Sequence, residues 1–249
     1  MTLLNFNWLI GVLANKPKLL TFKAAAKFKG PELLPTKKSE SFIAPMISIS
    51  FKSEQSQKLL KLNNIAIKDV YPHIEVKPSS LDKLKKNFSY NGKKIAFGVD
   101  SFEDYKIWYE ENFIELANKF YDDKVFDYIY LVCGKDKQHI VKNIIAKSNK
   151  NYFIDCSDLK LIDIIGAIKD SDFFVGNNSG PLNLAAALNV KSFGLFANTP
   201  ISQLKFSKVI PLVPENYIDN QFIKNREEMK KLTTDKVFQD ITKHLNNHI

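Results

Sequence analysis

Apolar and polar positions follow two different rhythms along the chain from residue 93 onward. Short apolar runs, typical of buried strands, alternate with segments in which apolar residues recur at helical spacing. Strands separated by helices of about ten residues form βαβ units, so the pattern predicts an α/β fold with a doubly wound parallel sheet. The predicted strands are 93–99, 126–134, 151–156, 172–177, 190–196 and 208–213. The predicted helices are 111–121, 136–148, 159–170, 181–188 and 233–247, the last with Thr233 or Thr234 as its N-cap.

The first ninety residues have a weaker pattern and are too few for a complete doubly wound domain. Helical spacing recurs at 54–65 and 79–88, and the Pro- and Ser-containing stretch 30–41 has the composition of a connector. An Asn-Gly turn within 89–94 marks the predicted domain boundary. We therefore predict a partial N-terminal domain at 1–90, a Rossmann-like domain at 91–235, and a C-terminal helix at 236–249 that packs back toward the N-terminal part.

Composition is that of an ordinary soluble globular protein, with 45% hydrophobic and 25% charged residues among 249. No run of 18 or more apolar residues occurs, so no membrane-spanning helix is expected. The first twenty residues lack the basic start and the cleavage site of a signal peptide. Cys133 and Cys156 each lie inside an apolar segment, so we expect buried thiols of a reduced, cytoplasmic protein and no metal site.

The net charge of +9 is unevenly distributed, because the first fifty residues contain seven lysines and only two glutamates. Such a bias suits an anionic surface, either nucleic acid or phospholipid headgroups. Arg226 is the chain's only arginine. Proteins that read nucleic-acid sequence depend on the bidentate guanidinium group, so we expect no nucleic-acid partner. A solvated basic surface without any partner is the alternative.

Small polar residues join the predicted strand 172–177 to the alanine-rich helix that follows it. In an open parallel sheet, ligands bind beyond the carboxyl ends of the strands, where helix N-termini converge. Pro181 is placed as the first helical residue, with Ser179 or Gly180 as the cap. The free N–H groups and the partial positive charge of such a helix end favour a phosphate. A well-capped helix without a ligand is the alternative interpretation.

A second loop, at 98–108, follows the first predicted strand and therefore reaches the same edge of the sheet. Ser101 and Lys106 could bind and neutralise phosphate oxygens there, and Trp108 would anchor the start of the next helix. An ordinary solvated lysine is the alternative for Lys106. Neither a G-x-x-x-x-G-K nor a G-x-G-x-x-G motif occurs, which disfavours an ATPase or a dinucleotide-dependent dehydrogenase.

The two loops resemble those of glycosyltransferase family 9, the heptosyltransferases of lipopolysaccharide assembly. The resemblance rests on Gly98, on Lys106-Ile107-Trp108 before a helix, and on VGNNSGPLNLAAA at 175–187. The segments LFANTP at 195–200 and EMKKLT at 228–233 extend it, so that it covers roughly residues 90 to 249.

This resemblance implies a GT-B architecture, in which the active site lies between two Rossmann-like domains and the C-terminal one is complete here. It also implies inverting, metal-independent and cofactor-free transfer of a heptose-like sugar from a nucleoside-diphosphate donor of the ADP-heptose type. The acceptor would be lipopolysaccharide or another lipid-linked cell-surface glycan, met in the cytoplasm at the anionic inner face of the inner membrane. The implied donor-binding residues are Gly98, Ser101, Lys106, Asn178, Ser179, Gly180 and Asn183.

Three departures from the family pattern affect the expected chemistry. Asn178 stands where the family has an aspartate, and Asn183 where it has a histidine, so neither position carries a charge. The family's opening strand and glycine-rich turn have no counterpart in residues 1–18, so we expect the chain to begin inside the N-terminal domain. The catalytic base, which that domain supplies in the family, is therefore not assigned. The candidates by residue type are Glu32, Glu40, Asp69 and Glu75.

These departures leave two other functional hypotheses open. One is a catalytically weak or inactive relative that binds a nucleotide-sugar or is a truncated gene product. The other is an enzyme of similar two-domain fold, such as a nucleotide-sugar epimerase. Retained donor binding without transfer would identify the inactive relative.

Overall fold

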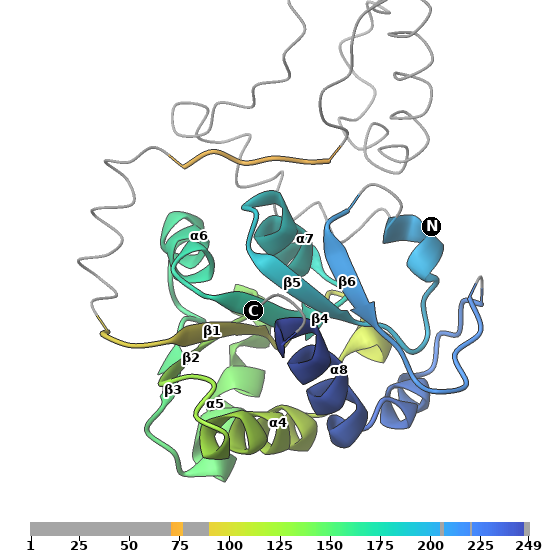
Figure 1. Cartoon of the computed structure of the whole chain (residues 1–249), viewed down its shortest axis with the longest axis horizontal. Helices are drawn as coiled ribbons and strands as arrows, with labels where there is room; N and C mark the ends of the chain where they lie inside the picture. Colours follow the sequence, from red (N-terminus) through yellow and green to blue (C-terminus); the bar gives the residue numbers. More distant parts are fainter. Residues whose placement is uncertain (1–70, 77–89, 205–206, 220, 247–249) are drawn as a thin grey trace, which may run out of the picture. The chain divides into compact units, whose positions relative to one another are not determined.

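Six short strands form one parallel sheet in the computed structural model, which describes residues 71–76, 90–204, 207–219 and 221–246 (Figure 1). Their order across the sheet is β3-β2-β1-β4-β5-β6. Every predicted strand is confirmed to within two residues at each end. The strands are β1 (Lys94–Gly98), β2 (Tyr128–Val132), β3 (Phe153–Asp155), β4 (Phe173–Asn177), β5 (Lys191–Leu195) and β6 (Val209–Leu212).

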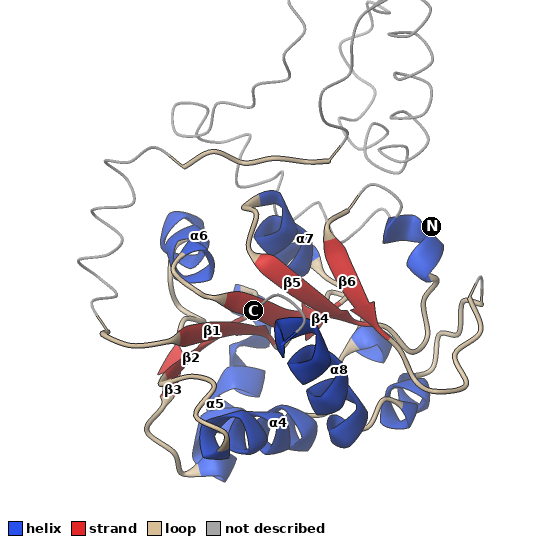
Figure 2. Ribbon diagram, viewed as in Figure 1, coloured by secondary structure: helices blue, strands red, loops and turns tan. Residues whose placement is uncertain are grey.

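Helices cover both faces of the sheet, which confirms the doubly wound α/β fold (Figure 2). One face carries α4 (Glu110–Asp122), α5 (Gln138–Ser148) and α8 (Thr234–Asn246), with α4 in contact with the other two. The opposite face carries α6 (Leu161–Lys169) and α7 (Gly180–Ala187), which contact each other. Short 3-10 turns lie at η1 (Asp104–Lys106), η2 (Lys135–Lys137), η3 (Ile201–Leu204) and η4 (Arg226–Lys231).

The core lies between the sheet and its helices and is rich in aromatic side chains. Phe113 of α4 packs between Phe97 of β1, at 5.6 Å between ring centroids, and Trp108, at 5.1 Å. On the other face, α7 is buried along almost its whole length because it lies close to β5. A Cβ on Gly194 of β5 would lie only 2.8 Å from the Leu182 side chain, so this close packing requires glycine.

The ends of two helices refine the predicted caps. Helix α7 begins at Gly180, so Pro181 is its second residue, whereas the sequence predicted it as the first. A glycine with its free N–H fits the first position equally well, and Ser179 is the cap. At α8, the Lys236 N–H donates to the Thr233 hydroxyl at 3.3 Å, which confirms Thr233 as the cap.

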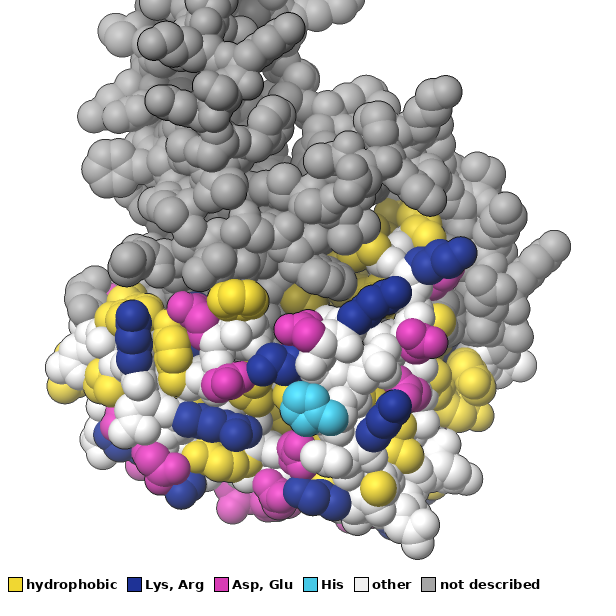
Figure 3. Space-filling view, turned by 180° about the vertical axis from the view of Figure 1, so that it is seen from behind, with side chains coloured by type: hydrophobic (Ala, Val, Ile, Leu, Met, Phe, Trp, Pro, Cys, Tyr) yellow, Lys and Arg dark blue, Asp and Glu magenta, His cyan; other side chains and the backbone are white. Residues whose placement is uncertain are grey.

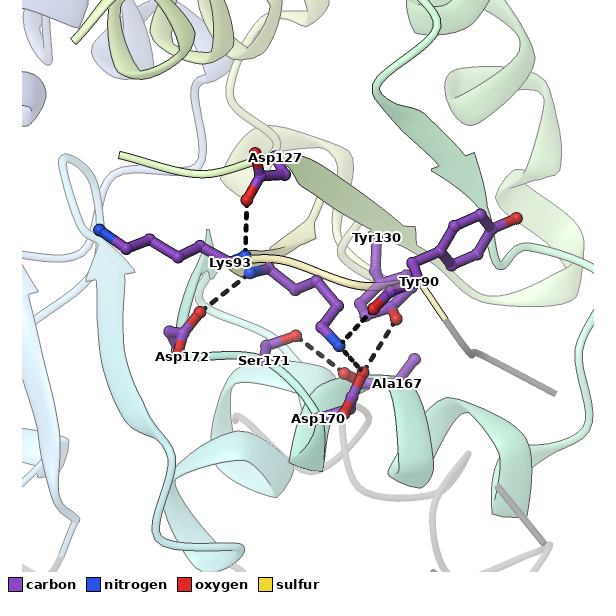
Figure 4. A network of polar contacts seen from close by, with 9 residues as sticks. Tyr90, Lys93, Asp127, Tyr130, Ala167, Asp170, Ser171 and Asp172 are labelled. Carbon is purple, nitrogen blue, oxygen red and sulfur yellow. Dashed lines mark hydrogen bonds and ion pairs between the residues drawn. The ribbon is translucent and has the colours of Figure 1, made fainter. Parts of the chain in front are cut away.

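Polar groups at the amino ends of the strands are bound to one another (Figure 4). The Asp172 carboxylate accepts the backbone N–H of Lys94 at 2.9 Å. The Lys94 ammonium pairs with Asp170 at 2.9 Å and donates to the Tyr90 carbonyl at 2.9 Å. The Tyr130 hydroxyl also donates to Asp170, at 3.0 Å. This amino-edge network connects β1, β2 and the α6–β4 turn.

Both cysteines are free and buried, as the sequence predicted. Burial raises the pKa of the Cys156 thiol to about 12 and that of Cys133 further still, so neither is a thiolate at neutral pH.

The last helix packs against α4, where the Phe120 and Phe238 rings lie 5.2 Å apart. The Lys119 ammonium also pairs with Asp235 at 2.8 Å. The expected contact of this helix with the N-terminal part involves residues outside the described ranges and stays a prediction.

Several sequence-based expectations fall largely outside the described residues. These are the helices at 54–65 and 79–88, the connector at 30–41, the basic first fifty residues and the domain at 1–90, of which the structure describes only 71–76 and 90. On one face of the described part, acidic and basic side chains alternate with apolar ones (Figure 3). No helix in the described ranges combines the length and the apolar character needed to cross a bilayer.

Candidate functional site

The candidate site lies where the strand order reverses, at the carboxyl ends of β1 and β4. The chain proceeds from β1 outward to β2 on one side and from β4 to β5 on the other. In such sheets ligands bind beyond the adjacent strand ends at this reversal. Gly98 and Gly176 are paired in the parallel register. A Cβ on Gly176 would lie 2.9 Å from the Gly98 carbonyl oxygen, and one on Gly98 would lie 2.5 Å from the Phe174 ring. Packing alone therefore accounts for Gly98, which the resemblance placed in the donor site.

The loops after β1 and β4 meet at this edge, as the sequence predicted. The Ser101 hydroxyl donates to the Asn178 carbonyl at 3.4 Å. The Asn177 side-chain oxygen accepts the backbone N–H of Trp108 at 2.9 Å. The Trp108 indole N–H donates in turn to the Leu232 carbonyl at 2.8 Å. Trp108 thus ties the β1 loop to β4 and to the segment before α8, beyond the anchoring role expected for it.

The two asparagines that depart from the family pattern are held by protein groups. Asn178 is buried, and its amide donates to the Thr199 hydroxyl at 3.1 Å. The amide of Asn183 donates to the Ser179 carbonyl at 3.1 Å, within its own helix. Asn183 is partly buried one turn into α7, and its donor group is directed at the protein in this structure.

Four buried polar atoms have no hydrogen-bond partner among the described residues: Asp100 Oδ1, Asn177 Nδ2, Ser179 Oγ and Lys106 Nζ. The last of these is ion-paired with Glu103, which leaves three without a polar partner in the described ranges. Ser179 is the cap residue of α7, yet its hydroxyl makes no capping bond within that described segment. Buried polar atoms are nearly always satisfied, and the exceptions concentrate where a ligand or ordered water belongs. Their gathering at the ends of β1 and β4 indicates a site built to hold a polar group.

Asp100, like Asn177, is a residue of this candidate site that the predicted set did not include. Its Oδ2 atom accepts the Gly134 N–H at 2.8 Å, which joins the β1 loop to the end of β2. Burial raises the pKa of Asp100 to about 6, against the opposing effect of the Gly134 hydrogen bond and with a further contribution from the charge of Asp136. An acidic residue directly after a buried strand and beside Ser101 was the available signal.

Lys106, the predicted phosphate-binding cation, is almost fully buried, with 1% of its side chain exposed. Its ammonium pairs with Glu103 at 2.5 Å. The Tyr105 hydroxyl donates to the other oxygen of the same carboxylate at 2.6 Å. Partial burial by itself would raise the pKa of Glu103, but the hydrogen bonds from Lys106 and Tyr105 outweigh it and hold the pKa below its usual range.

The single arginine braces the same loop. Arg226 Nε donates to the Ile107 carbonyl at 3.0 Å, and the guanidinium lies 4.4 Å from the centroid of the Tyr109 ring. These contacts fix η4 against the β1 loop and add a cation–π interaction. Arg226 is therefore engaged by protein groups.

A pocket of about 590 Å³ opens next to the site, between the loop after β6 and the start of α8. Tyr217, Glu228 and Lys236 are among its lining residues. The Tyr217 hydroxyl donates to the Thr199 carbonyl at 2.8 Å, so one wall of the pocket is bonded to the residue that holds Asn178.

Within the described ranges, no group of three or more His, Cys, Asp or Glu side chains could hold a metal ion. The expected independence from metal stays a prediction, as do the donor-binding roles of the residues that the resemblance implied.

Comparisons with known proteins bear on this geometry. The sequence profile of glycosyltransferase family 9 (heptosyltransferase) matches residues 51–241. No curated protein matches the chain. Among solved structures, the ADP-heptose LPS heptosyltransferase II of E. coli has 18% identity and a TM-score of 0.60, over 74% of this chain and 56% of that one.

Two further structures are similar to this chain. The glycosyl transferase family 9 protein from Veillonella parvula has 16% identity and a TM-score of 0.60, over 75% of this chain and 58% of that one. The E. coli heptosyltransferase WaaC with ADP has 19% identity and a TM-score of 0.51, over 61% and 44%. At these identities the likeness shows the fold, and the chain spans about half the length of these three proteins.

Proposed function

Because this chain belongs to glycosyltransferase family 9, we propose that it binds a nucleoside-diphosphate sugar of the ADP-heptose type at the carboxyl ends of β1 and β4. It transfers the heptose-like sugar to lipopolysaccharide or another lipid-linked glycan of the cell surface. The observation that carries this proposal is the group of buried polar atoms at Asp100, Asn177 and Ser179 that lack partners among the described residues. Similar structures that hold ADP and ADP-2-deoxy-2-fluoro heptose support this class of donor.

The proposed chemistry depends on stabilising the charge that develops on the leaving diphosphate. The N-terminus of α7 follows directly after β4, and its free N–H groups and partial positive charge favour a bound phosphate. The Ser179 hydroxyl and the Lys106 ammonium add a hydrogen-bond donor and a full charge, in place of a divalent cation. Binding the diphosphate in this position also orients the anomeric carbon of the donor.

Transfer itself is proposed to invert the anomeric centre. A hydroxyl of the acceptor attacks the anomeric carbon from the side opposite the diphosphate. A new carbon–oxygen bond forms as the bond to the phosphate oxygen breaks, and the hydroxyl proton passes to a carboxylate base. We assign that base to no residue, because the candidates Glu32, Glu40 and Asp69 lie outside the described ranges and Glu75 lies apart from the site motifs in sequence.

The decisive experiment measures binding of ADP and ADP-heptose by calorimetry, with EDTA and with Mg²⁺. We expect binding without metal, and Lys106→Met should weaken it by about tenfold to a hundredfold, since a charge-assisted phosphate contact contributes about 1.5–3 kcal/mol. Lys147→Met is the control, because Lys147 pairs with Glu110 and Glu111 on the outer side of α4 and α5. Absence of nucleotide binding, or a strict need for Mg²⁺, would contradict the proposal.

One observation favours a second candidate function, donor binding with little or no transfer. The Asn183 amide is bound within its own helix and cannot become cationic, so one source of leaving-group stabilisation in the family is missing. Release of ADP from ADP-heptose, measured with and without a lipopolysaccharide acceptor, separates the two. Binding without acceptor-dependent release would select the second candidate.

We also propose that the protein works in the cytoplasm, peripherally at the inner face of the inner membrane. The lysine-rich first fifty residues support this, since each lysine near an anionic surface contributes about 1 kcal/mol. Sedimentation with vesicles should require anionic lipid and weaken with salt. Equal sedimentation with neutral vesicles would reject it.

A further inference from the structure

The Lys106–Glu103 pair differs from the other lysine–carboxylate pairs at the same spacing. Lys230 and Lys231 pair with acids three residues earlier, and their side chains are 58% and 63% exposed. Lys106 is 1% exposed, whereas its partner Glu103 is 18% exposed. The lysine is therefore the buried member of the pair, and the carboxylate is the member in partial contact with solvent. A buried ammonium needs a counter-charge, so this pair is more than a surface contact.

Glu103 is bound as an external anion would be. One carboxylate oxygen contacts the Lys106 ammonium and the other accepts the Tyr105 hydroxyl, at 2.5 Å and 2.6 Å. The charge of Lys224 also acts favourably on the carboxylate. Two cations and a hydroxyl donor thus surround one negative charge. The Tyr105 ring packs edge-on against Phe222, with centroids 5.8 Å apart, which holds the hydroxyl in place.

The segment that carries Glu103 is the most exposed part of the loop after β1. Phe102 is 57% exposed, and the Asp104 side chain is 76% exposed. Lys106, three residues later, is fully enclosed. Of the two charges in the pair, only that of Glu103 has appreciable contact with solvent.

We propose that Glu103 is an internal anion that occupies Lys106 until the diphosphate of the donor displaces it. This inference rests on the proposed function, because it takes the Lys106 ammonium as the diphosphate contact. A diphosphate carries more than one negative charge and more acceptor oxygens than a carboxylate, so it can replace Glu103 and still satisfy the buried ammonium. A ligand without that charge cannot. Because of Glu103, only a ligand with sufficient negative charge binds at Lys106, and the competition lowers the affinity of the site for that ligand.

The test is calorimetry with ADP, inorganic pyrophosphate and adenosine on the native chain, Glu103→Gln and Glu103→Ala. Both variants should lower the Kd of ADP and of pyrophosphate by about tenfold, within the usual range for coupling between competing interactions. The Kd of adenosine, which carries no phosphate, should not change. Asp170→Asn is the matched control, because it neutralises the partner of a partly buried lysine at the opposite edge of the sheet.

The outcomes separate this inference from the proposed function. If no form of the chain binds ADP, the proposed function fails and this inference fails with it. If the native chain binds ADP and both Glu103 variants bind it equally or more weakly, Glu103 positions Lys106 and the inference alone is overturned. Loss of cooperative thermal unfolding in both variants would overturn it too, since Glu103 would then be required for the fold. Tighter ADP binding without tighter pyrophosphate binding would also contradict it.

Discussion

The two edges of the sheet differ in how completely their polar groups are hydrogen-bonded. At the amino edge, carboxylates of Asp170 and Asp172 accept bonds from Lys94 and Tyr130, and the network is closed by protein groups (Figure 4). At the carboxyl edge, Asp100, Asn177 and Ser179 each keep a buried polar atom that finds no partner in the described part of the chain. Both edges are polar, so polarity does not identify the site. The unsatisfied buried polar atoms distinguish the carboxyl edge as the candidate site, because a folded chain tolerates such atoms chiefly where something else binds.

The first prediction concerns Asp100, where we expect the largest effect on the stability of the protein. Burial raises the pKa of this carboxyl from 3.8 to about 6, so the folded state holds the proton more tightly than the unfolded state does. Stability should therefore fall as pH rises from about 4 to 6 and remain lower above, by about 3 kcal/mol in total. Asp100→Asn removes this penalty, so its stability relative to the native chain should increase over the same window.

Urea denaturation at pH 4, 5, 6 and 7 measures this difference. If the free energies of unfolding of the native chain and of Asp100→Asn depend on pH in the same way, ionisation of Asp100 does not destabilise the folded state. The contrast between the two edges would then be lost.

A second prediction concerns the close approach of β1 and β4 at Gly98 and Gly176. Gly176→Ala should destabilise the protein by about 2 kcal/mol, because its Cβ would lie 2.9 Å from the Gly98 carbonyl and backbone cannot easily move. Gly134→Ala, at the end of β2, is the control. Its Cβ would lie 2.9 Å from the Asp136 carboxylate and 3.2 Å from that of Asp100. Both contacts are with side-chain atoms, which shift more easily than backbone, so thermal denaturation should show a smaller loss. Equal losses would mean that the strand ends are not tightly constrained.

The amino edge provides the third prediction. Asp170→Ala removes the partner of the Lys94 ammonium and of the Tyr130 hydroxyl, and should cost about 1.5 kcal/mol of stability at these partly exposed groups. ADP binding should be unchanged, because the network faces away from the strands' carboxyl ends. Chemical denaturation and calorimetry on the same sample measure both. Weakened ADP binding in a folded Asp170→Ala protein would show that the two edges are coupled.

The smallest expected effect comes from restoring the family residues with Asn178→Asp and Asn183→His together. An aspartate at 178 can accept the Thr199 hydroxyl in place of the present bond, and a histidine at 183 can become cationic beside the diphosphate. The N-terminal end of α7 disfavours that cation, but the two phosphate charges nearby favour it more strongly, so we expect ADP release to rise by about two- to fivefold. The measurement compares both proteins with and without acceptor. High native turnover that falls in the double variant would show that the asparagines are adapted working residues.

Much of the fold could be predicted because the relevant signals are local. The spacing of apolar residues predicted every strand and α-helix that the structure describes from 93 onward, and Thr233 was among the expected caps. It did not predict the four short 3-10 turns. The convergence of the 98–108 and 177–183 loops followed from one rule, that parallel strands place their carboxyl ends at one edge. What failed was fine placement: the start of α7 at Gly180 and not Pro181, since one residue either way satisfies the same capping pattern.

The sequence by itself determined the fold class, the convergence of the two candidate-site loops at one edge and the resemblance to glycosyltransferase family 9, because periodicity and short motifs carry that information. Only the tertiary structure decided which groups at that edge are satisfied. The bond from Gly134 to Asp100 spans 34 residues, and that from Trp108 to Asn177 spans 69. Packing between distant segments likewise decides the strand order, the burial of Lys106 beside Glu103 and the requirement for glycine beside Phe174. A hydrogen bond or a close contact depends on positions in space to within a fraction of an ångström, which no local pattern of residues specifies.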